Sequence, residues 1–553
     1  MRRLTTALMA AALASNTAAA QTIDPRYDVA DGWDYSILDT YVPHPGDPDK
    51  NWMKTNFGVV QDHKAEVAPR DSAYGYSGAR GADGSRVADV DNDDAHLLDV
   101  LTVYEGSKEL FVYLNDWNGK HYNAVYRQKI GDGCGASEEA IFFDFDGDGK
   151  PDIVCAATKE GGGVTGDRIY VYFNLIGTEA CPKAVQSTGK DASACWSSKG
   201  AVVGAETPHK KWYRIGGDMG SIDFNNDNCP DLVIGSANGD VGVLWCPPSD
   251  RKTPASWVYQ EIPWDADDGE VQRLMTMTYP IKGVPYTWLI WSVKSPNAGV
   301  YASKYFPNEQ NPAQPGLFSK PVEIVDGVKS MEFDIGEIDG ADANGDSYPD
   351  LVLPTRGDTG GVGLVRVYFG APGLVAPWFQ QTPLILTPAW ESALCNRLRT
   401  YNVVKGAAIG DIWNNPNAPS GKTYNEIVIM GRGCPYASNG FFYFDPGSDD
   451  PAPTNPANYV WRSLTNQAGN IFQDQEVEKW DRPQLADMDC DGDLDVISAD
   501  EEGDWYDTFR NGVNDPNPVR TGDDPNDYGV GTLIFWNPTV TASEPGCAAP
   551  MPN

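Results

Sequence analysis

Carboxylate side chains recur at every second position in a stretch that opens at Asp144. The carboxylates of this stretch are Asp144, Asp146, Asp148 and Asp152. Gly149 gives the backbone the freedom for a sharp turn, because glycine has no Cβ. Oxygen ligands at this spacing can wrap around a hard cation. The stretch therefore predicts a loop that binds a divalent cation, and Ca²⁺ is the ion that we expect.

The same pattern recurs three times further along the chain, with asparagine in place of some aspartates. The corresponding residues are Asp223, Asn225, Asp227 and Asp231; Asp342, Asn344, Asp346 and Asp350; and Asp487, Asp489, Asp491 and Asp495. Each copy leads into a short run of β-branched and aliphatic residues, which favours a β-strand directly after each loop. The loops are therefore expected to join two strands.

Two further copies are irregular. The first contains Asp89, Asp91, Asp93 and Asp99. Its closing Asp99 comes late, so it is the least regular of the ion sites that we predict. The second begins at Asp411 and continues to Glu426 after an insertion. It has lost the ligand spacing, and we expect this unit to hold no metal.

The spacing of the loops indicates a chain built from repeated small sheets. The step from Asp223 to Asp342 is about two ordinary steps long. Inside it, residues 274–278 and 287–291 flank a turn at residues 282–283 and indicate a further unit without an ion loop. Such sheets must bury their faces against their neighbours, which favours a ring. The fold class that we predict is all-β: a seven-bladed β-propeller with Ca-binding DxDxDG loops.

The first and last units show how the ring would be completed. In the first unit, residues 109–114 and 122–130 flank a turn at residues 118–119, which predicts a hairpin. After the last loop only one further strand remains, residues 531–536. We expect residues 57–61 to supply the missing outer strand and close the ring.

The Asp-x-Asp-x-Asp-Gly-x-x-Asp loops followed by Val- and Ile-rich strands resemble the FG-GAP/VCBS repeat propellers. That family includes integrin α-subunit heads, some lectins and several polysaccharide lyases. The resemblance covers residues 57–540, nearly all of the chain after its first segment. It implies a propeller whose ion loops are structural. It does not select an activity, because one fold hosts many functions.

The two ends of the chain have a different composition from the repeats. Residues 1–20 combine Arg2 and Arg3 with an apolar stretch and Ala18, Ala19 and Ala20, which is typical of a secretory signal peptide. We expect residues 21–56 to form an N-terminal arm, residues 57–540 the propeller, and residues 541–553 a C-terminal tail. No later stretch reaches the roughly 18 consecutive apolar residues of a membrane span. We therefore predict a secreted, extracellular protein without a membrane span.

Charge and cysteine content narrow the partners and the compartment. The net charge of −36 argues against a nucleic-acid partner, which would need a cationic face. Ten cysteines in an exported chain favour disulfides. The sequence contains no CxxC pair, so metal binding by these cysteines is not favoured. The geometry of the propeller that the resemblance implies suggests sequential pairing: Cys134 with Cys155, Cys181 with Cys195, Cys229 with Cys246, Cys395 with Cys434, and Cys490 with Cys547.

In such a propeller, the loops opposite the ion loops surround the mouth of the central channel. Read from those loops and the segments beside them, the substrate-binding candidates are Lys159, Lys294, Arg356, Arg399, Arg432 and Trp505. Cations converging on a channel mouth suit a carboxylated ligand, such as a uronate of an acidic polysaccharide. The alternative is that these are ordinary loop charges paired with nearby carboxylates.

A lyase acting on a uronate needs cations to neutralise the carboxylate, a base for the C5 proton and an acid for the leaving oxygen. Our candidates for the base and the acid are Tyr436, Tyr506 and Lys405. A hydrolase that pairs Asp481 with Glu501 or Glu502 is also conceivable, although no spacing demonstrates it.

The function that we predict is that of a secreted carbohydrate-active protein, a monomer that acts on an extracellular acidic polysaccharide. Polysaccharide lyase is the first choice, and a non-catalytic, calcium-dependent lectin or adhesion protein is the alternative. A lectin would tend to repeat the same ligands in several units. Here the loops differ, and the longest, residues 501–531, is unique, which favours one composite site.

Overall fold

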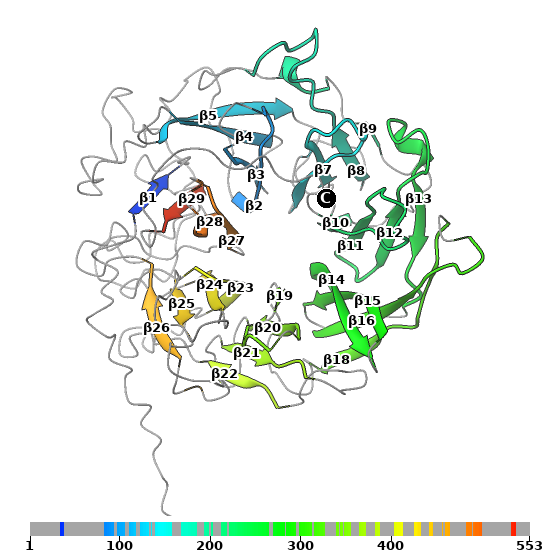
Figure 1. The fold of residues 1–553 in the computed structure, drawn as a ribbon, viewed down its shortest axis with the longest axis vertical. Coiled ribbons are helices and arrows are strands. Elements are labelled where there is room, and N and C mark those ends of the chain that lie inside the picture. The colour runs from blue at the N-terminus through cyan, green and yellow to red at the C-terminus, as the bar shows by residue number, and fades with distance from the viewer. Residues whose placement is uncertain are drawn as a thin grey trace, which may run out of the picture.

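Short antiparallel sheets arranged around a central axis make up the described part of the chain (Figure 1). The computed structural model describes residues 34–37, 82–92, 97–104, 110–117, 122–131, 134, 139–157, 168–184, 193–197, 201–202, 212–217, 221–264, 269–281, 284–294, 298–311, 314–326, 339–341, 343–346, 348–355, 364–371, 382–386, 403–412, 425–432, 442–445, 456, 459–464, 483–488, 490, 492–499 and 532–537. These residues form seven sheets, and their helical content is confined to short 3₁₀ turns. The fold is therefore all-β.

We number the sheets one to seven in chain order. The first three contain β2 (Ala82–Ala88), β3 (Asp99–Tyr104), β4 (Leu110–Trp117) and β5 (Tyr122–Gly131); β6 (Ala140–Phe143), β7 (Asp152–Ala157), β8 (Arg168–Tyr172) and β9 (Ala201–Val202); and β10 (Trp212–Gly216), β11 (Leu232–Ser236), β12 (Val241–Trp245) and β13 (Val258–Glu261). Strands that follow one another along the chain pair side by side, so each sheet is a meander.

The other four sheets follow the same order, and the fourth has an extra strand. They contain β14 (Val271–Ile281), β15 (Val284–Val293), β16 (Gly299–Phe306), β17 (Leu317–Phe318) and β18 (Val322–Asp326); β19 (Asp339–Ala341), β20 (Asp350–Pro354), β21 (Val365–Tyr368) and β22 (Leu384–Leu386); β23 (Val403–Gly410), β24 (Glu426–Arg432), β25 (Phe442–Asp445) and β26 (Val460–Ser463); and β27 (Gln484–Ala486), β28 (Asp495–Ala499), β29 (Thr532–Trp536) and β1 (Asp34–Ile37). The strand nearest the axis is the first strand of its sheet along the chain, such as β14 or β23, except in the seventh sheet, where β27 is innermost and β1 is outermost (Figure 1).

Two hairpins predicted from turn residues are confirmed. Strands β4 and β5 pair antiparallel, with Leu114 opposite Tyr126, and the predicted turn residues between them lie outside the described part. Strands β14 and β15 pair from Val271 to Val293 and enclose residues 282–283. The fourth sheet therefore joins its first two strands by a connection of two residues, where several other sheets have an acidic loop.

The outer strand of the seventh sheet comes from an unexpected part of the chain. Strand β1 pairs antiparallel with β29, with Tyr35 opposite Phe535. The prediction that residues 57–61 fill this place is wrong, because β1 occupies it, and residues 57–61 lie outside the described part. Tyr35 and Ile37 have high β-propensity, but four residues carry too short a pattern to be recognised in a segment without repeats. The described N-terminal and C-terminal strands thus meet in one sheet.

Hydrophobic side chains fill the spaces between neighbouring sheets. Phe143 and Val154 of the second sheet share one cluster with Ile215 and Leu232 of the third. Similar clusters join the first sheet to the second, and each of the third, fourth and fifth sheets to the next. A further cluster joins the first sheet to the seventh. Each of these small sheets thus buries its faces against its neighbours, as a repeat architecture requires.

Three disulfides predicted as sequential pairs are confirmed. They join Cys134 to Cys155, Cys181 to Cys195, and Cys229 to Cys246. Cys490 is also disulfide-bonded, while Cys395, Cys434 and Cys547 lie outside the described residues. Disulfides form and persist in oxidising compartments, which agrees with an exported chain. The predicted signal peptide and C-terminal tail also lie outside the described part.

Candidate functional site

The loop between β6 and β7 is folded around its own carboxylates. Asp144 accepts hydrogen bonds from the backbone N–H groups of Gly147, at 2.8 Å, and Gly149, at 3.1 Å. Both glycines have positive φ angles, +78° and +86°, which other residues rarely adopt. Carboxylate oxygens of Asp144, Asp146 and Asp152 all lie within 4.8 Å of one another. The alternation of acids therefore brings three carboxylates to one place, as the spacing predicted.

Asp152 has a second role, which the spacing did not reveal. Its side chain is buried, and its oxygens accept N–H groups from Phe145, at 3.0 Å, and Asn174, at 2.8 Å. It thus ties the start of the loop to the segment after β8. Burial raises the pKa of Asp152 to about 8, and the charge of Asp146 adds to the effect against the hydrogen bonds that lower it. A nearby cation would favour the ionised form.

The same pair of contacts recurs in other sheets, and we call the acid that makes them the closing carboxylate. In each case one oxygen accepts the N–H that follows the first loop residue, and the other accepts an N–H at the end of the third strand. The closing carboxylates with both contacts are Asp99, Asp152, Asp231, Asp350 and Asp495. All are almost fully buried. These acids are therefore part of the framework of their sheets as well as candidate ligands.

Glu426 stands where the sixth sheet would have its closing carboxylate. Its Oε2 accepts the N–H of Ile412 at 2.9 Å, and its side chain is buried. Sequence analysis placed Glu426 in a unit that had lost its ligands and assigned it no role. An insertion and the exchange of Asp for Glu hid the position, and the signal that could have found it is an acid at the first residue of the second strand.

The remaining acidic loops resemble the second only in part. In the first sheet, carboxylate oxygens of Asp89, Asp91 and Asp99 lie within 4.8 Å of one another. Burial, followed by the charge of Asp91, raises the pKa of Asp99 well above its usual value. This irregular copy thus gathers its acids more closely than its spacing suggested. Asp93 lies outside the described residues.

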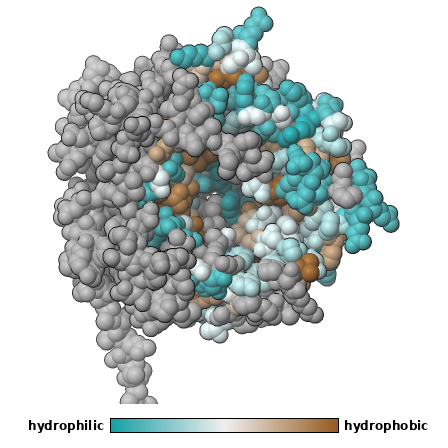
Figure 2. All heavy atoms as spheres, in the orientation of Figure 1, coloured by the Kyte–Doolittle hydropathy of each residue, from teal (hydrophilic) through white to brown (hydrophobic). Residues whose placement is uncertain are grey.

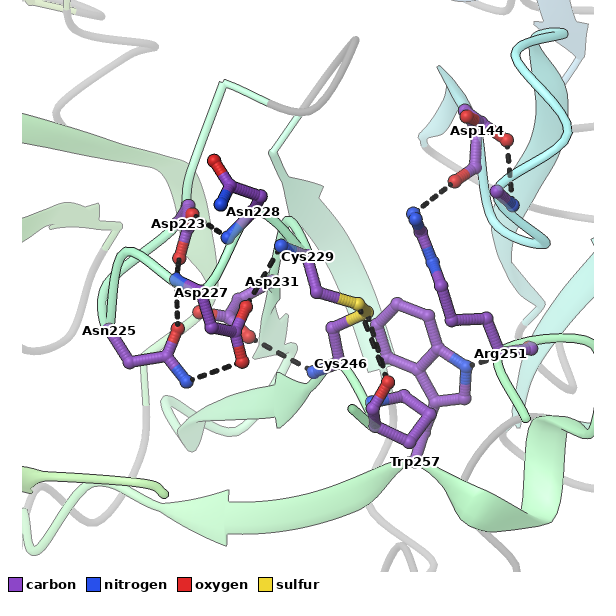
Figure 3. The surroundings of a disulfide bond; sticks show 12 residues. Asp144, Asp223, Asn225, Asp227, Asn228, Cys229, Asp231, Cys246, Arg251 and Trp257 are labelled. Atoms are coloured by element: carbon purple, nitrogen blue, oxygen red, sulfur yellow. Dashed lines mark hydrogen bonds between the residues drawn. A yellow bond between two sulfur atoms is a disulfide. The ribbon is translucent and has the colours of Figure 1, made fainter. Parts of the chain in front are cut away.

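The loop of the third sheet is held by hydrogen bonds among its own side chains (Figure 3). Asn225 donates from Nδ2 to Asp227 at 2.9 Å, and Asp223 accepts the N–H of Asn228 at 3.0 Å. Burial raises the pKa of its closing Asp231 to about 7. In the fifth and seventh sheets, Asn344, Asp346, Asp350, Asp487 and Asp495 are described, while Asp342, Asp489 and Asp491 are not.

The donor atoms of the second loop fit the predicted ion. All side-chain donors are oxygens, they converge from alternate residues, and the closing acid is buried where an isolated negative charge is unfavourable. Such a set suits Ca²⁺, which would neutralise the carboxylates and hold the loop. Asp144, Asp146 and Asp152 are the residues that would bind it first, with Asp148 exposed at the rim.

The structure places few of the predicted substrate residues. The substrate-binding candidates outside the described residues are Lys159, Arg356, Arg399 and Trp505, and the catalytic candidates outside them are Tyr436 and Tyr506. The side chain of Arg432, at the end of β24, is not described either. Lys294 is described, and its ammonium lies 3.3 Å from Oε2 of Glu270. This pairing is the one that the alternative interpretation, ordinary paired loop charges, would give.

Lys405 lies on the innermost strand β23 and not at an open loop. Its side chain is only 2% exposed. The strand is irregular at this point, because the pairing with β24 shifts between Val404 and Gly406. A bulge of this kind turns a side chain away from the regular alternation of a strand.

A cluster of ionic side chains, whose arginines no sequence pattern singled out, lies on or beside the innermost strands. Glu139, just before β6, forms an ion pair with Arg86 of β2 and accepts a hydrogen bond from Arg273 of β14 at 3.3 Å. Its other oxygen accepts the N–H of Ile215 at 3.0 Å. Buried Arg214 precedes Ile215 on β10. We call Arg86, Glu139, Arg214 and Arg273 the axial cluster.

The position of the axial cluster follows from the sheets it joins. Glu139 belongs to the second sheet and Arg273 to the fourth, with the third between them along the ring. Residues of such sheets can touch only near the axis. Arg214 and Arg273 both follow register shifts in their strands, after Trp212 and Val271. Bulges are frequent beside functional sites, where they redirect side chains.

One face of the ring is hollowed near its centre. Figure 2 shows this hollow in the same orientation as Figure 1, with hydrophilic side chains among those at its wall. The side chain of Arg273 is 15% exposed, compared with 5% for Arg86 and Glu139. Arg273 is therefore the most accessible member of this ion-paired group.

Comparison with known proteins finds similarity to solved structures at low identity and low TM-score. No protein-family model matches the chain, and no curated protein matches it. Among solved structures it is similar to a GH62 hydrolase in complex with xylotriose, at 12% identity over 58% of this chain and 88% of that chain with a TM-score of 0.26. It is similar to the Dos1 propeller at 9% identity, over 85% and 95% of the two chains, with a TM-score of 0.37.

A third similar structure is the endo-arabinase from Bacteroides thetaiotaomicron, at 12% identity over 56% of this chain and 94% of that chain with a TM-score of 0.23.

None of the described segments forms a helix with the length and hydropathy that a bilayer crossing requires.

Proposed function

We propose that this chain is a secreted, seven-bladed β-propeller of the FG-GAP/VCBS type, stabilised by Ca²⁺ in its acidic loops. Support comes from the seven described sheets around one axis and from the acidic loop that joins the first two strands of several of them. In this view each sheet is one blade. Asp144, Asp146 and Asp152 hold one ion, and Asp89, Asp91 and Asp99 hold another.

We further propose that the ligand is an acidic polysaccharide bound near the axis. The observation that carries this proposal is the gathering of arginines on the innermost strands of a chain whose net charge is −36. Guanidinium groups bind carboxylates in a bidentate geometry, and an arginine can contact two acceptors at once. Arg273 is the member that a uronate would reach first, with Arg86 paired to the same Glu139 beside it.

The reaction that we propose is β-elimination at a uronate. The base takes the C5 proton, the electron pair forms the C4–C5 double bond, the C4–O bond breaks, and the leaving oxygen takes a proton from the acid. Neutralisation of the carboxylate by arginine makes the C5 proton more acidic. Tyr436, Tyr506 and Lys405 remain the candidates for base and acid, and Lys405 lies on the innermost strand β23.

The proposal is tested by incubating the protein with a panel of polyuronates and sulfated glycans in the presence of Ca²⁺. Elimination gives an unsaturated uronate that absorbs in the ultraviolet. We expect absorbance to rise with one substrate class, and Arg273→Ala to abolish the rise. Arg273→Lys keeps the charge but loses the bidentate geometry, so it should retain part of the activity.

Circular dichroism of both variants separates loss of the site from loss of the fold. Saturable binding of one glycan without any rise in absorbance would overturn the lyase assignment and favour the lectin alternative. If a folded Arg273→Ala variant acted on its substrate at the rate of the unsubstituted protein, the axial location of the site would be wrong.

A further inference from the structure

The acidic loop of the second sheet contacts two cationic side chains that belong to the third sheet. Arg251 donates from Nη2 to the backbone oxygen of Asp144 at 2.9 Å (Figure 3). The ammonium of Lys252 lies 3.1 Å from Oδ2 of Asp146. Both residues lie in the connection between β12 and β13, more than a hundred residues along the chain from the loop. Each therefore reaches the loop through the packing of neighbouring sheets.

This connection is held in a fixed position. The ring of Trp257 stacks on Phe145, the residue after Asp144, with centroids 4.3 Å apart. The indole N–H of Trp257 donates to the backbone oxygen of Arg251 at 3.2 Å. At its start, Cys246 is bonded to Cys229 in the loop of the third sheet. Lys252 is thus attached to a segment anchored on both sides, although its own side chain is 68% exposed.

Arg251 and Lys252 differ in what they contact. Arg251 binds a backbone oxygen, and its guanidinium covers Gly147, where an added Cβ would lie 2.8 Å from Nη1. Lys252 binds a side-chain oxygen of Asp146, one of the three carboxylates that converge in the loop. An ammonium and a divalent cation would therefore compete for the same carboxylate, whereas the arginine contact leaves the ligand oxygens alone.

We propose that Lys252 is a built-in counter-ion of the second loop, which competes with a divalent cation for Asp146 and sets the affinity of that site. This inference rests on the proposed function, in which the loop binds Ca²⁺. Occupation of the loop by a divalent cation releases Lys252 from Asp146, and departure of the cation restores the ion pair. Because the two contacts exclude each other, whatever strengthens the Lys252 contact weakens cation binding.

The test measures binding of Tb³⁺ and of Ca²⁺ to the full chain after treatment with chelator. Terbium emission and calorimetry report binding directly, without any enzymatic activity. The contribution of the second loop is the part of each titration that disappears in Asp144→Asn. Lys252→Met keeps the aliphatic stem but removes the charge, and we expect it to tighten this component about two- to fivefold at low salt. The effect should shrink as ionic strength rises.

Two control variants separate local competition from a general change in charge. Lys320→Met removes one exposed charge from the fourth sheet and should leave the component unchanged. Arg251→Met removes a cation beside the same loop without freeing a ligand oxygen, so it should tighten binding less than Lys252→Met does. Equal affinities for Lys252→Met and Lys320→Met would overturn the competition. If Asp144→Asn removed no component at all, the loop would not be a cation site, and the proposed calcium loop itself would fail.

Discussion

Glu139 and Arg273 form an ion pair between sheets that are not neighbours in the ring. Oε1 of Glu139 lies 3.3 Å from Nη1 of Arg273, although the whole third sheet separates them along the chain. The same carboxylate pairs with Arg86 of the first sheet and accepts an N–H from Ile215 of the third. One buried acid thus connects four consecutive sheets at their inner edges.

We predict that Glu139→Gln strongly lowers the stability of the protein. The amide can still accept the N–H of Ile215, but it leaves the charges of Arg86 and Arg273 without this carboxylate. Removing one partner of a buried ion pair costs about 3–5 kcal/mol. Thermal unfolding followed by circular dichroism should show a clearly lower Tm. Glu309→Gln, at an exposed position, is the matched control, and a similar Tm for both variants would contradict the structural role of the axial cluster.

A second prediction separates the framework role of the closing carboxylate from its role as a ligand. In Asp152→Asn an amide nitrogen, which donates, replaces one of the two accepting oxygens. The N–H group of either Phe145 or Asn174 therefore loses its acceptor. A buried donor left unsatisfied costs about 1–3 kcal/mol. We expect this loss of stability both with Ca²⁺ and with chelator, measured by denaturant unfolding.

Asp148→Asn in the same loop is the comparison, because Asp148 is exposed and does not tie the strands together. It should leave stability in chelator unchanged and reduce only the stabilisation by added Ca²⁺. If both variants lost stability only when Ca²⁺ is present, the hydrogen bonds of Asp152 would have no independent value.

The pH dependence of stability follows from the raised pKa values of the closing carboxylates. Burial raises the pKa to about 8 for Asp152 and to about 7 for Asp231. An unfolded aspartate titrates near pH 4, so the folded protein holds protons that the unfolded chain has released. The stability from these groups is therefore complete below about pH 4 and lost as the pH rises toward about 8.

In chelator we expect the Tm to fall across this window. Ca²⁺ would offset the charges of the ionised acids, so the rise in Tm on adding Ca²⁺ should grow with pH over the same range. Scanning calorimetry at several pH values, with and without Ca²⁺, measures both trends. A gain in Tm that is constant with pH would show that the ion does not bind at these carboxylates.

The repeated parts of the fold could be predicted from the sequence. Alternating acids closed by Asp152 or Asp231 predict a loop followed by a strand, because they combine ligand spacing with a run of β-formers. The hairpin of β14 and β15 was found from its turn residues without any acidic loop. These features depend on residues close together in the chain, which is why they are visible in it.

The parts that sequence analysis missed depend on contacts between distant segments. Strand β1 is recognisable only when β29 lies beside it, and Glu426 only when Ile412 shows which atom it binds. The arginines of the axial cluster stand on strands, where a charged residue is expected to face solvent. Register shifts before Arg214 and Arg273 interrupt the regular alternation of side chains along these strands. No local sequence pattern predicts such a shift. The cations predicted from the sequence are assigned to loops, and most of them lie outside the described residues, so the prediction did not extend to these strands.

The last prediction concerns the disulfide in the loop of the third sheet. Cys229→Ala combined with Cys246→Ala removes a crosslink between residues 17 apart, and closure of a loop of this size is worth about 3 kcal/mol. The double variant should unfold at lower denaturant concentration and show no additional thiol under denaturing conditions. The single Cys229→Ala variant should instead reveal one thiol more. The backbone N–H of Cys229 donates to Asp227 at 2.8 Å, and that of Cys246 donates to Asp231 at 3.0 Å. Loss of the disulfide should therefore also weaken cation binding by this loop. Unchanged cation affinity in a folded double variant would mean that the loop keeps its shape without the crosslink.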